Sequence, residues 1–496
     1  MKRASLASLL AALSSACTLM PHYQRPALPV STSWPADAAV PADRAATPPS
    51  RLPGGSDVAA DQIGWRDFFR DPRLQQLIEI ALDNNRNLRI AVLNVAASQA
   101  QFRVQRSNLF PSISASGAET VEYLGSNSAL PIPAPAGSVG GAGGSGFTFR
   151  TFTASLGFTN YELDLFGRQR SLTTDAFEQY LAQGETRRST QISLVAEVAT
   201  DYFAVLADQA LVKLTEDTLK SQSESYALTQ AQYERDTTTL LSLRQAESTV
   251  DTARANLAQY RRQLAQDTHA LTLVLGQDMP ADLPPAPDLN DESLLESVPV
   301  GLPSDLIARR PDILSAEHAL RAANANIGAA RAAFFPSIDL TGSGGSSSAR
   351  LQDLFSKGTG TWSFSPTINL PIFTGGQNKA NLDLANVQKN IQIATYEQTI
   401  QIAFREVSDA LSARSTYRDQ LLAQKALVDA DAEAYRLSEL RFRQGVDSYL
   451  STLTSQVSLY GAQQTLATLR QSELTNEVTL YKALGGGWTQ HTTWAQ

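Results

Sequence analysis

The side chains that most often carry out catalysis or bind metals are few and scattered along this chain of 496 residues. There is one cysteine, Cys17, which excludes both a disulfide framework and a cysteine-based metal site. The glycine-rich stretch at 140–144 is not followed by Lys-Ser/Thr and does not join a strand to a helix, so it is not a phosphate loop. The four histidines share no ligand spacing: His22, His269, His318 and His491. We therefore predict no enzyme activity, no metal site and no cofactor.

The chemistry that Cys17 supports is acylation of its thiol during export. A basic pair at 2–3 precedes a short apolar run at 6–13, and small residues at 14–16 lead directly to the cysteine. This order resembles a bacterial lipoprotein signal, in which the cysteine is lipidated and becomes the first mature residue. Thr18 stands where an aspartate would favour retention in the inner membrane, so the pattern predicts delivery to the outer membrane. The alternative is an ordinary cleaved signal followed by an incidental thiol.

The composition narrows the class of protein and its partners. The net charge of −8 does not favour a phosphate-binding surface, so we predict no nucleic-acid partner. Aromatic residues make up only 7% of the chain, and long stretches lack proline and glycine, which favours long helices over a thick globular core. After the signal, no segment is apolar over 18 or more residues, so no transmembrane helix is predicted.

The chain repeats one design twice. The word Phe110-Pro111 returns as Phe335-Pro336, and further landmarks recur at a constant separation of 209 residues. A constant separation means that the two copies have no net insertion between those landmarks, so duplication dictates the architecture. The landmark pairs are Gly167 and Gly376, Glu197 and Glu406, Tyr233 and Phe442, Leu241 and Leu450, Leu257 and Leu466, and Leu275 and Leu484.

Each copy contains two amphipathic strands after its Phe-Pro word. Apolar and polar side chains alternate over 151–159 and over 362–372, which is the period of a strand with one buried face. In the first copy the alternation slips by one residue at Asn160, which predicts a β-bulge. Polar, glycine-rich loops near 118–147 and 342–359 are expected to separate the strands of each pair.

The rest of each copy is almost purely helical, over about 168–274 and 377–483. A 4-3 spacing of apolar residues predicts coiled-coil packing of antiparallel helices, and in the first copy only Asp267 interrupts it. The predicted seam contains, in the first copy, Ala246, Val250, Ala253, Leu257, Tyr260, Leu264, Leu271 and Val274, and, in the second, Ser455, Leu459, Ala462, Leu466, Leu469, Leu480 and Ala483.

Two breaks in these helices predict the tips of helical hairpins, near 236–238 and near 444–447. Gly445 suits the positive φ that a tight tip requires. Asp236 occupies the matching place in the first copy and suits that conformation less well, so we expect the two tips to differ.

The strands require partners. Four strands per chain cannot close a membrane barrel, which needs about eight, and an open sheet in lipid leaves unpaired edges. Identical chains in a ring can complete the strands, and three chains leave a lumen that two would fill. The helices that continue from the strands would form a second tube. The sequence thus predicts a hollow conduit with one end in a membrane.

The chain also resembles the TolC-like outer-membrane efflux proteins, specifically the lipoprotein branch that serves resistance-nodulation-division drug pumps. The shared words run from residue 65 to residue 488: Trp65-x-x-Phe68-x-x-Asp71-Pro72, Phe110-Pro111, Phe166-Gly167-Arg168, Arg309-Arg310-Pro311-Asp312-Ile313, Ala325-x-Ile327-Gly328, Phe335-Pro336, Phe442-x-x-Gly445-Val446, and Tyr481 to Trp488. The resemblance implies an internally duplicated α+β fold, with four strands contributed to a trimeric 12-stranded transmembrane β-barrel and long coiled-coil helices that form a periplasmic α-barrel. It implies a homotrimer that contacts outer-membrane lipid, a periplasmic adaptor protein and an inner-membrane transporter.

The resemblance further implies roles for residues at the hairpin tips. Leu450 matches an apolar position of the periplasmic gate, and the alternative for it is packing in the helical seam. Thr454 stands where relatives often carry aspartate, so Asp447 would supply part of the acidic gate ring. The residues that would contact the adaptor, with a simple turn as the alternative, are Asp236, Thr237, Gly445 and Val446.

The expected organisation follows the duplication. A signal peptide at 1–16 precedes an extended arm at 17–60, the first structural repeat at 61–286, a linker at 287–302, the second repeat at 303–484 and a tail at 485–496.

The predicted function is a passive duct in the bacterial outer membrane, lipid-anchored and extending into the periplasm, that exports drugs and other small molecules for a tripartite efflux pump. A duct for type I protein secretion or for metal-cation efflux remains the alternative. A lipid-anchored structural coiled coil is a weaker alternative, because such a protein has no use for the alternating strands.

Overall fold

The computed structural model describes residues 18–35, 60–125, 147–291, 293–295, 298 and 309–492. Cys17, the signal segment, much of the N-terminal arm and most of the first glycine-rich loop lie outside the described residues. The chain divides into two compact units. The sheet unit comprises Ala97–Tyr180, Ala319–Gln392 and the N-terminal residues up to Arg25, and the hairpin unit comprises Pro26–Ala96, Leu181–His318 and Ile393–Gln496. In the described part of the chain, every helix is too short or too polar to cross a lipid bilayer.

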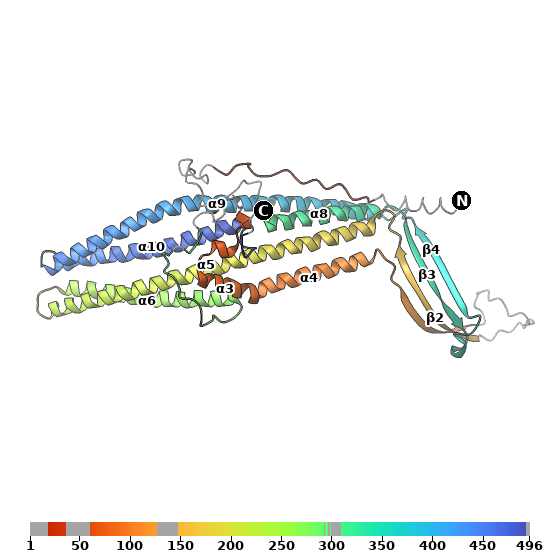
Figure 1. Cartoon of the computed structure of the whole chain (residues 1–496), viewed down its shortest axis with the longest axis horizontal. Coiled ribbons are helices and arrows are strands. Elements are labelled where there is room, and N and C mark those ends of the chain that lie inside the picture. Colours follow the sequence, from red (N-terminus) through yellow and green to blue (C-terminus); the bar gives the residue numbers. More distant parts are fainter. Residues whose placement is uncertain are drawn as a thin grey trace, which may run out of the picture. The chain divides into compact units, whose positions relative to one another are not determined.

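Long helices occupy the predicted positions in both copies (Figure 1). Both predicted tips separate helices, because α5 ends at Tyr233 before α6 and α9 ends at Arg443 before α10. The described helices are η1 (Ala60–Gln62), α2 (Trp65–Phe68), α3 (Pro72–Asn84), α4 (Arg86–Ser107), α5 (Arg168–Tyr233), α6 (Leu240–Leu275), α8 (Pro311–Ala332), η2 (Leu351–Asp353), α9 (Gln377–Arg443) and α10 (Tyr449–Ala483).

The strands of the two copies form one antiparallel sheet in the order β1-β2-β3-β4 (Figure 1). The strands are β1 (Ser114–Leu124), β2 (Phe147–Glu162), β3 (Ser337–Ser348) and β4 (Gly360–Asn369). The copies join where β2 pairs with β3, and the register of this pair shifts between Phe158 and Tyr161. Asn160, inside the shift, has a φ of 53°. The predicted bulge at Asn160 is therefore confirmed.

The strands that precede the two loops extend further than predicted, so the predicted loops near 118–147 and 342–359 start too early. β1 continues to Leu124 and β3 continues to Ser348, through residues that the composition had assigned to loops. The reason is close pairing of small residues, because a Cβ atom on Gly345 would lie 2.6 Å from the Cα of Ser155 on β2. Glycine marks a close backbone approach at this place, where the sequence alone suggested an irregular segment.

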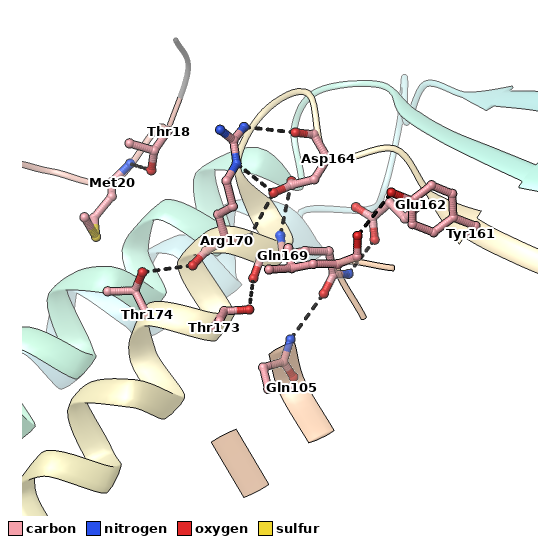
Figure 2. A network of polar contacts seen from close by, with 11 residues as sticks. Thr18, Met20, Gln105, Tyr161, Glu162, Asp164, Gln169, Arg170, Thr173 and Thr174 are labelled. Atoms are coloured by element: carbon pink, nitrogen blue, oxygen red, sulfur yellow. Dashed lines mark hydrogen bonds and ion pairs between the residues drawn. The ribbon is translucent and has the colours of Figure 1, made fainter. Parts of the chain in front are cut away.

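A polar network joins the end of β2 to the start of α5 in the sheet unit (Figure 2). The Asp164 carboxylate accepts hydrogen bonds from the backbone amides of Gln169, at 3.2 Å, and Arg170, at 2.9 Å, and from the Arg170 Nε, at 3.1 Å. Glu162 accepts from the Gln169 Nε2 at 2.7 Å, and Gln105 of α4 donates to the Gln169 Oε1 at 3.2 Å. The Asp164 carboxylate thereby occupies backbone amides that a helix N-terminus leaves unpaired, and Glu162 and Gln105 hold the Gln169 side chain beside them.

The helical seams follow the prediction in the first copy and depart from it in the second. Six of the predicted seam residues of α6 are buried, as is Leu275 at its end, while Tyr260 and Leu264 are half-buried and Asp267 interrupts the seam. Near the tip of α10 the buried face instead includes Tyr449, Leu453, Gln456 and Tyr460, while Ser455 and Leu459 are only half-buried. The face is displaced because α10 also packs on the first hairpin. The Tyr460 hydroxyl lies 2.9 Å from the Thr215 hydroxyl, and the Gln456 Nε2 donates to the Ser221 Oγ at 3.1 Å.

The main core of the hairpin unit ties the start of the fold to its end. Tyr481 stacks on Phe68 with 4.0 Å between ring centroids, and its hydroxyl donates to the Ile63 carbonyl at 2.6 Å. The Trp65 amide donates to the Thr489 carbonyl at 3.0 Å. The segments around Trp65 and Tyr481, which are far apart in sequence, therefore pack against each other.

Two buried charged residues fix the helices around this core. Asp71 caps α3 by accepting from the Arg73 amide at 2.8 Å, and it also accepts from the Tyr202 hydroxyl of α5 at 2.5 Å. Asp71 is therefore the N-cap of α3, with proline at the first helical position. Arg310 donates to Glu406 of α9 at 2.8 Å and to the Ala483 carbonyl at the end of α10 at 2.9 Å.

We predict that Gly486→Ala lowers the melting temperature of the protein. A Cβ atom at position 486 would overlap the ring of Tyr481, which cannot move away without losing its stack on Phe68. Overpacking of this kind costs about 1–3 kcal/mol. Thermal melts of the variant should be compared with Gly461→Ala, whose new methyl group meets open space on α10. Equal melting temperatures for the two variants would contradict the prediction.

Candidate functional site

The two hairpin tips have the same backbone. Asp236 and Gly445, which are 209 residues apart, both adopt the left-handed conformation, with φ of 55° and 72°. At each tip the amide of this residue donates to the carbonyl three residues earlier, and the next amide donates to the carbonyl five residues earlier. The N–O distances are 3.0 and 2.9 Å in the first tip and 2.9 and 2.9 Å in the second. The expected difference between the tips is therefore wrong for the backbone, because aspartate tolerates this conformation.

The side chains of the tips do differ. In the second tip the Asp447 carboxylate accepts from the Arg441 Nε at 2.6 Å and from its Nη2 at 3.0 Å. These hydrogen bonds lower the pKa of Asp447, so the carboxylate is ionised and paired on its own hairpin. The first tip has Thr238 and Gln232 at the matching positions and carries no such pair. The four predicted adaptor-contact residues are all exposed: Asp236, Thr237, Gly445 and Val446.

Leu450 does not pack in the seam of its own chain. Its side chain is 52% exposed, whereas the neighbouring Tyr449 and Leu453 are buried against Ala246 of α6. Thr454 lies one turn further along α10, also exposed, and its hydroxyl donates to the Leu450 carbonyl at 2.9 Å. One face of the first turns of α10 therefore packs on the first hairpin. The other face carries the predicted gate residues Leu450 and Thr454 and is exposed to a further contact.

A pair of carboxyl groups interrupts the seam between α5 and α6. Asp208 of α5 is only 6% exposed and lies within hydrogen-bonding reach of Asp267 of α6. Its Oδ2 is buried and has no donor. Two carboxyl groups at this separation can form a hydrogen bond only when one of them is protonated. Burial, together with the hydrogen bond and the charge of Asp267, raises the pKa of Asp208 to about 7.

The surroundings of the pair add negative charge. Burial raises the pKa of Asp201, two turns earlier on α5, to about 6, with further contributions from Glu197 and Asp267. On α6, Tyr260 lies close enough to Asp208 to be affected by its charge. From α10, Gln464 donates to the Tyr260 hydroxyl at 2.8 Å. The charges that act on Asp208 and Asp201 are both negative and belong to Asp267 and Glu197.

The comparison with known families matches the two halves of the chain separately. A family described as outer membrane efflux protein matches residues 77–277 and 302–486. The chain belongs to the outer membrane efflux protein family. It is accordingly a channel protein of the bacterial outer membrane and not an enzyme, which confirms those predictions.

Relatives of this outer membrane efflux protein match it along almost its whole length. The toluene efflux pump outer membrane protein TtgC of Pseudomonas putida is 51% identical over 476 residues, covering 96% of this chain and 94% of TtgC. Outer membrane protein OprJ of Pseudomonas aeruginosa is 41% identical, covering 98% of this chain and 96% of OprJ. The open-state structure of the MtrE outer membrane channel of Neisseria gonorrhoeae is 37% identical, with a TM-score of 0.84 over 96% of this chain and 100% of MtrE.

Sequence reasoning missed the carboxyl pair of this efflux protein. The signal was available, because Asp267 was the one interruption of the seam in the first copy. In an antiparallel hairpin, residues equally far from the tip face each other, and the residue of α5 as far from the tip at 237–238 as Asp267 is Asp208. The roles of Leu450, Thr454, Asp447 and the tip residues remain predictions, as does the lipidation of Cys17, which lies outside the described residues.

We predict that the stability of the α5–α6 hairpin increases as the pH falls from 8 to 5. The pKa values of Asp208 and Asp201 are raised above their ordinary value of 3.8. The folded chain therefore binds more protons than the unfolded chain over this window, so acidification favours folding. Asp267→Asn removes the second carboxyl group and should stabilise the protein at pH 8 by on the order of 2 kcal/mol, with little effect at pH 5.

The measurement is the melting temperature of the wild type and Asp267→Asn across this pH range. The control is Asp251→Asn, which removes an exposed acid from the same helix. If Asp267→Asn and Asp251→Asn shift the melting temperature equally at every pH, the carboxyl pair does not carry the effect.

Proposed function

We propose that the protein is the outer-membrane duct of a tripartite efflux pump, through which drugs and other small organic molecules leave the cell. The observation that carries the proposal is the 51% identity to TtgC over nearly the full length of both chains, since TtgC is a toluene efflux pump component. The duct itself would be passive, because the family provides a channel. Energy would come from an inner-membrane transporter, reached through a periplasmic adaptor.

We further propose that the working form is a homotrimer. β1 and β4 are the edge strands of the four-stranded sheet, and each has one edge of backbone groups without a partner strand within the described chain. β4 also has large exposed apolar side chains, including Trp362, Phe364 and Ile368. A soluble monomer rarely leaves such a surface uncovered. Edge-to-edge pairing of three copies would give the edge strands their missing partners, and the exposed apolar side chains of β4 would then face lipid.

The adaptor would bind the hairpin tips. Their four candidate residues are exposed, and the tip backbones are the same in both copies, so each chain offers two copies of one backbone motif. The exposed apolar side chain of Val446 in the second tip and the polar Thr237 in the first give the two copies different contact chemistry.

We predict that deletion of the gene raises the accumulation of hydrophobic organic cations and neutral antibiotics in the source cell, and that the intact gene restores efflux. The test is dye and drug accumulation over a panel that also includes metal ions. Raised accumulation of metal ions alone would assign the duct to metal-cation efflux. If deletion changes the accumulation of no compound in the panel, the drug-efflux proposal is contradicted, and protein secretion remains as the alternative function.

The gate proposal predicts that Leu450→Ser makes the outer membrane leaky, because three exposed leucines around the axis of the duct would no longer exclude water. The duplicated chain provides a matched control in Leu241→Ser, since Leu241 is the equivalent residue of the first copy and is 67% exposed. The measurement is the uptake of an antibiotic too large for general porins. Equal uptake in the two variants would argue against a gate at Leu450.

A further inference from the structure

The two halves of the chain place different residues at one matching position, directly before the helices α4 and α8. Asn85 precedes α4 and Arg310 precedes α8, and they are 225 residues apart, which is also the separation of the two Phe-Pro words. The Asn85 Nδ2 donates to the Val274 carbonyl at 2.8 Å, and the Arg310 Nη1 donates to the Ala483 carbonyl at 2.9 Å. Val274 and Ala483 are themselves equivalent residues of the two halves. The matching position therefore makes the same backbone contact in both halves.

In the second half, this position supplies a buried guanidinium that two carboxylates hold. Arg310 is 7% exposed. It donates to Asp312 from its Nε at 3.0 Å and from its Nη2 at 2.6 Å, and the Nη2 also donates to Glu406 at 2.8 Å. Such charge-assisted hydrogen bonds are the stronger class in proteins. Glu406 is thus part of a built binding site for a guanidinium.

The first half keeps the acid of this site and lacks the guanidinium. Glu197 is the equivalent of Glu406, whereas the position of Arg310 is held by Asn85. The position of Asp312 is also neutral in the first half, where it is Asn87. The asparagine side chain carries no charge, so this position does not give Glu197 the partner that Glu406 has.

A polar cleft of about 450 Å³ opens at Glu197 in the hairpin unit, and we call it the Glu197 cleft. Its lining includes Thr190, Ser193 and Glu197 of α5, together with Asn85 and Asn87. The three residues of α5 are spaced by three and four positions, so they lie on one face of the helix. Glu197 is exposed, which makes it accessible to a solute. The volume falls within the range of sites that bind small molecules.

The charge of the Glu197 cleft favours a cation over an anion. The helices α4 and α8 begin at the cleft, and a helix N-terminus by itself attracts anions. Both ends are capped by the chain, because Asn85 accepts from the Leu88 amide at 3.0 Å and Asp312 accepts from the next amide at 2.9 Å. Asp201 follows Glu197 by one turn of α5 and adds a further acid beside the cleft.

We propose that the Glu197 cleft binds a small organic cation that carries a guanidinium group. The Glu197 carboxylate accepts hydrogen bonds from this group, as Glu406 does from Arg310. The hydroxyl oxygens of Thr190 and Ser193 accept from its remaining N–H groups, of which a guanidinium has five in one plane. A metal ion fits less well, because the described part of the chain places no three histidine, cysteine or carboxylate side chains to ligate one. This site is additional to the proposed efflux function and does not depend on it.

The test is equilibrium binding of butylguanidinium to the purified full chain in lipid nanodiscs, measured by isothermal titration calorimetry at low salt. Butylurea, which is neutral and has nearly the same shape, is the ligand control. We expect the wild type to bind butylguanidinium, to lose affinity as added salt screens the charge, and not to bind butylurea. Absence of binding, or equal binding of the two compounds, overturns the site.

Three variants locate the binding within the chain. Glu197→Gln removes the charge and keeps the shape, so the affinity should fall about tenfold or more. Glu224→Gln removes an exposed acid further along α5, outside the cleft, and should bind as the wild type does. Asn85→Arg gives the first half the residue of the second, and its own guanidinium should occupy the cleft and abolish binding. If Asn85→Arg does not fold, Glu197→Gln decides alone, and an unchanged affinity in Glu197→Gln overturns the proposal.

Discussion

Each half of the chain changes direction at three places where one residue takes the left-handed backbone conformation. The pairs are Gly167 and Gly376 (75° and 89°), Asp236 and Gly445 (55° and 72°), and Gly276 and Gly485 (74° and 85°), where the angles are φ. The members of each pair are 209 residues apart. Five of the six are glycine, the residue for which positive φ carries no steric cost. Because these reversals set the lengths of the helices between them, they also set which residues face each other across every seam.

This constraint explains why the helices and tips could be predicted from the sequence and why other features could not. The helix breaks at the tips and the bulge at Asn160 each have a local signature, so the pattern identified them. The extent of β3 depends on close pairing of Gly345 with β2, which no local signal records. The displaced face of α10 depends on contacts such as that of Tyr460 with Thr215 in the other copy. These features result from tertiary contacts, and periodicity within one helix or strand does not report them.

The two halves share a backbone and differ in their charges. The network at Asp164 has no acidic counterpart in the second half, where Phe373 occupies the matching position. Asp267 corresponds to Asn476, which donates a neutral hydrogen bond to the Ala410 carbonyl at 3.0 Å. The ion pair of Asp447 exists only in the second tip. Duplication thus repeats the scaffold, and substitution at exposed or seam positions has given each half its own electrostatics.

Several residues that carried the resemblance to a family lie in environments unlike those of the residues proposed to carry function. Gly328, Arg310 and Gly486 lie where two segments approach closely, and each is constrained by a neighbour in the same chain. Such constraints persist as long as the fold does, so these words identify the family. Leu450 and Val446 are exposed, and nothing in the chain itself fixes their identity. Under the proposed function, contacts with other subunits or partners would set their chemistry, so one sequence predicts where the proposed gate and the tips lie better than how they work.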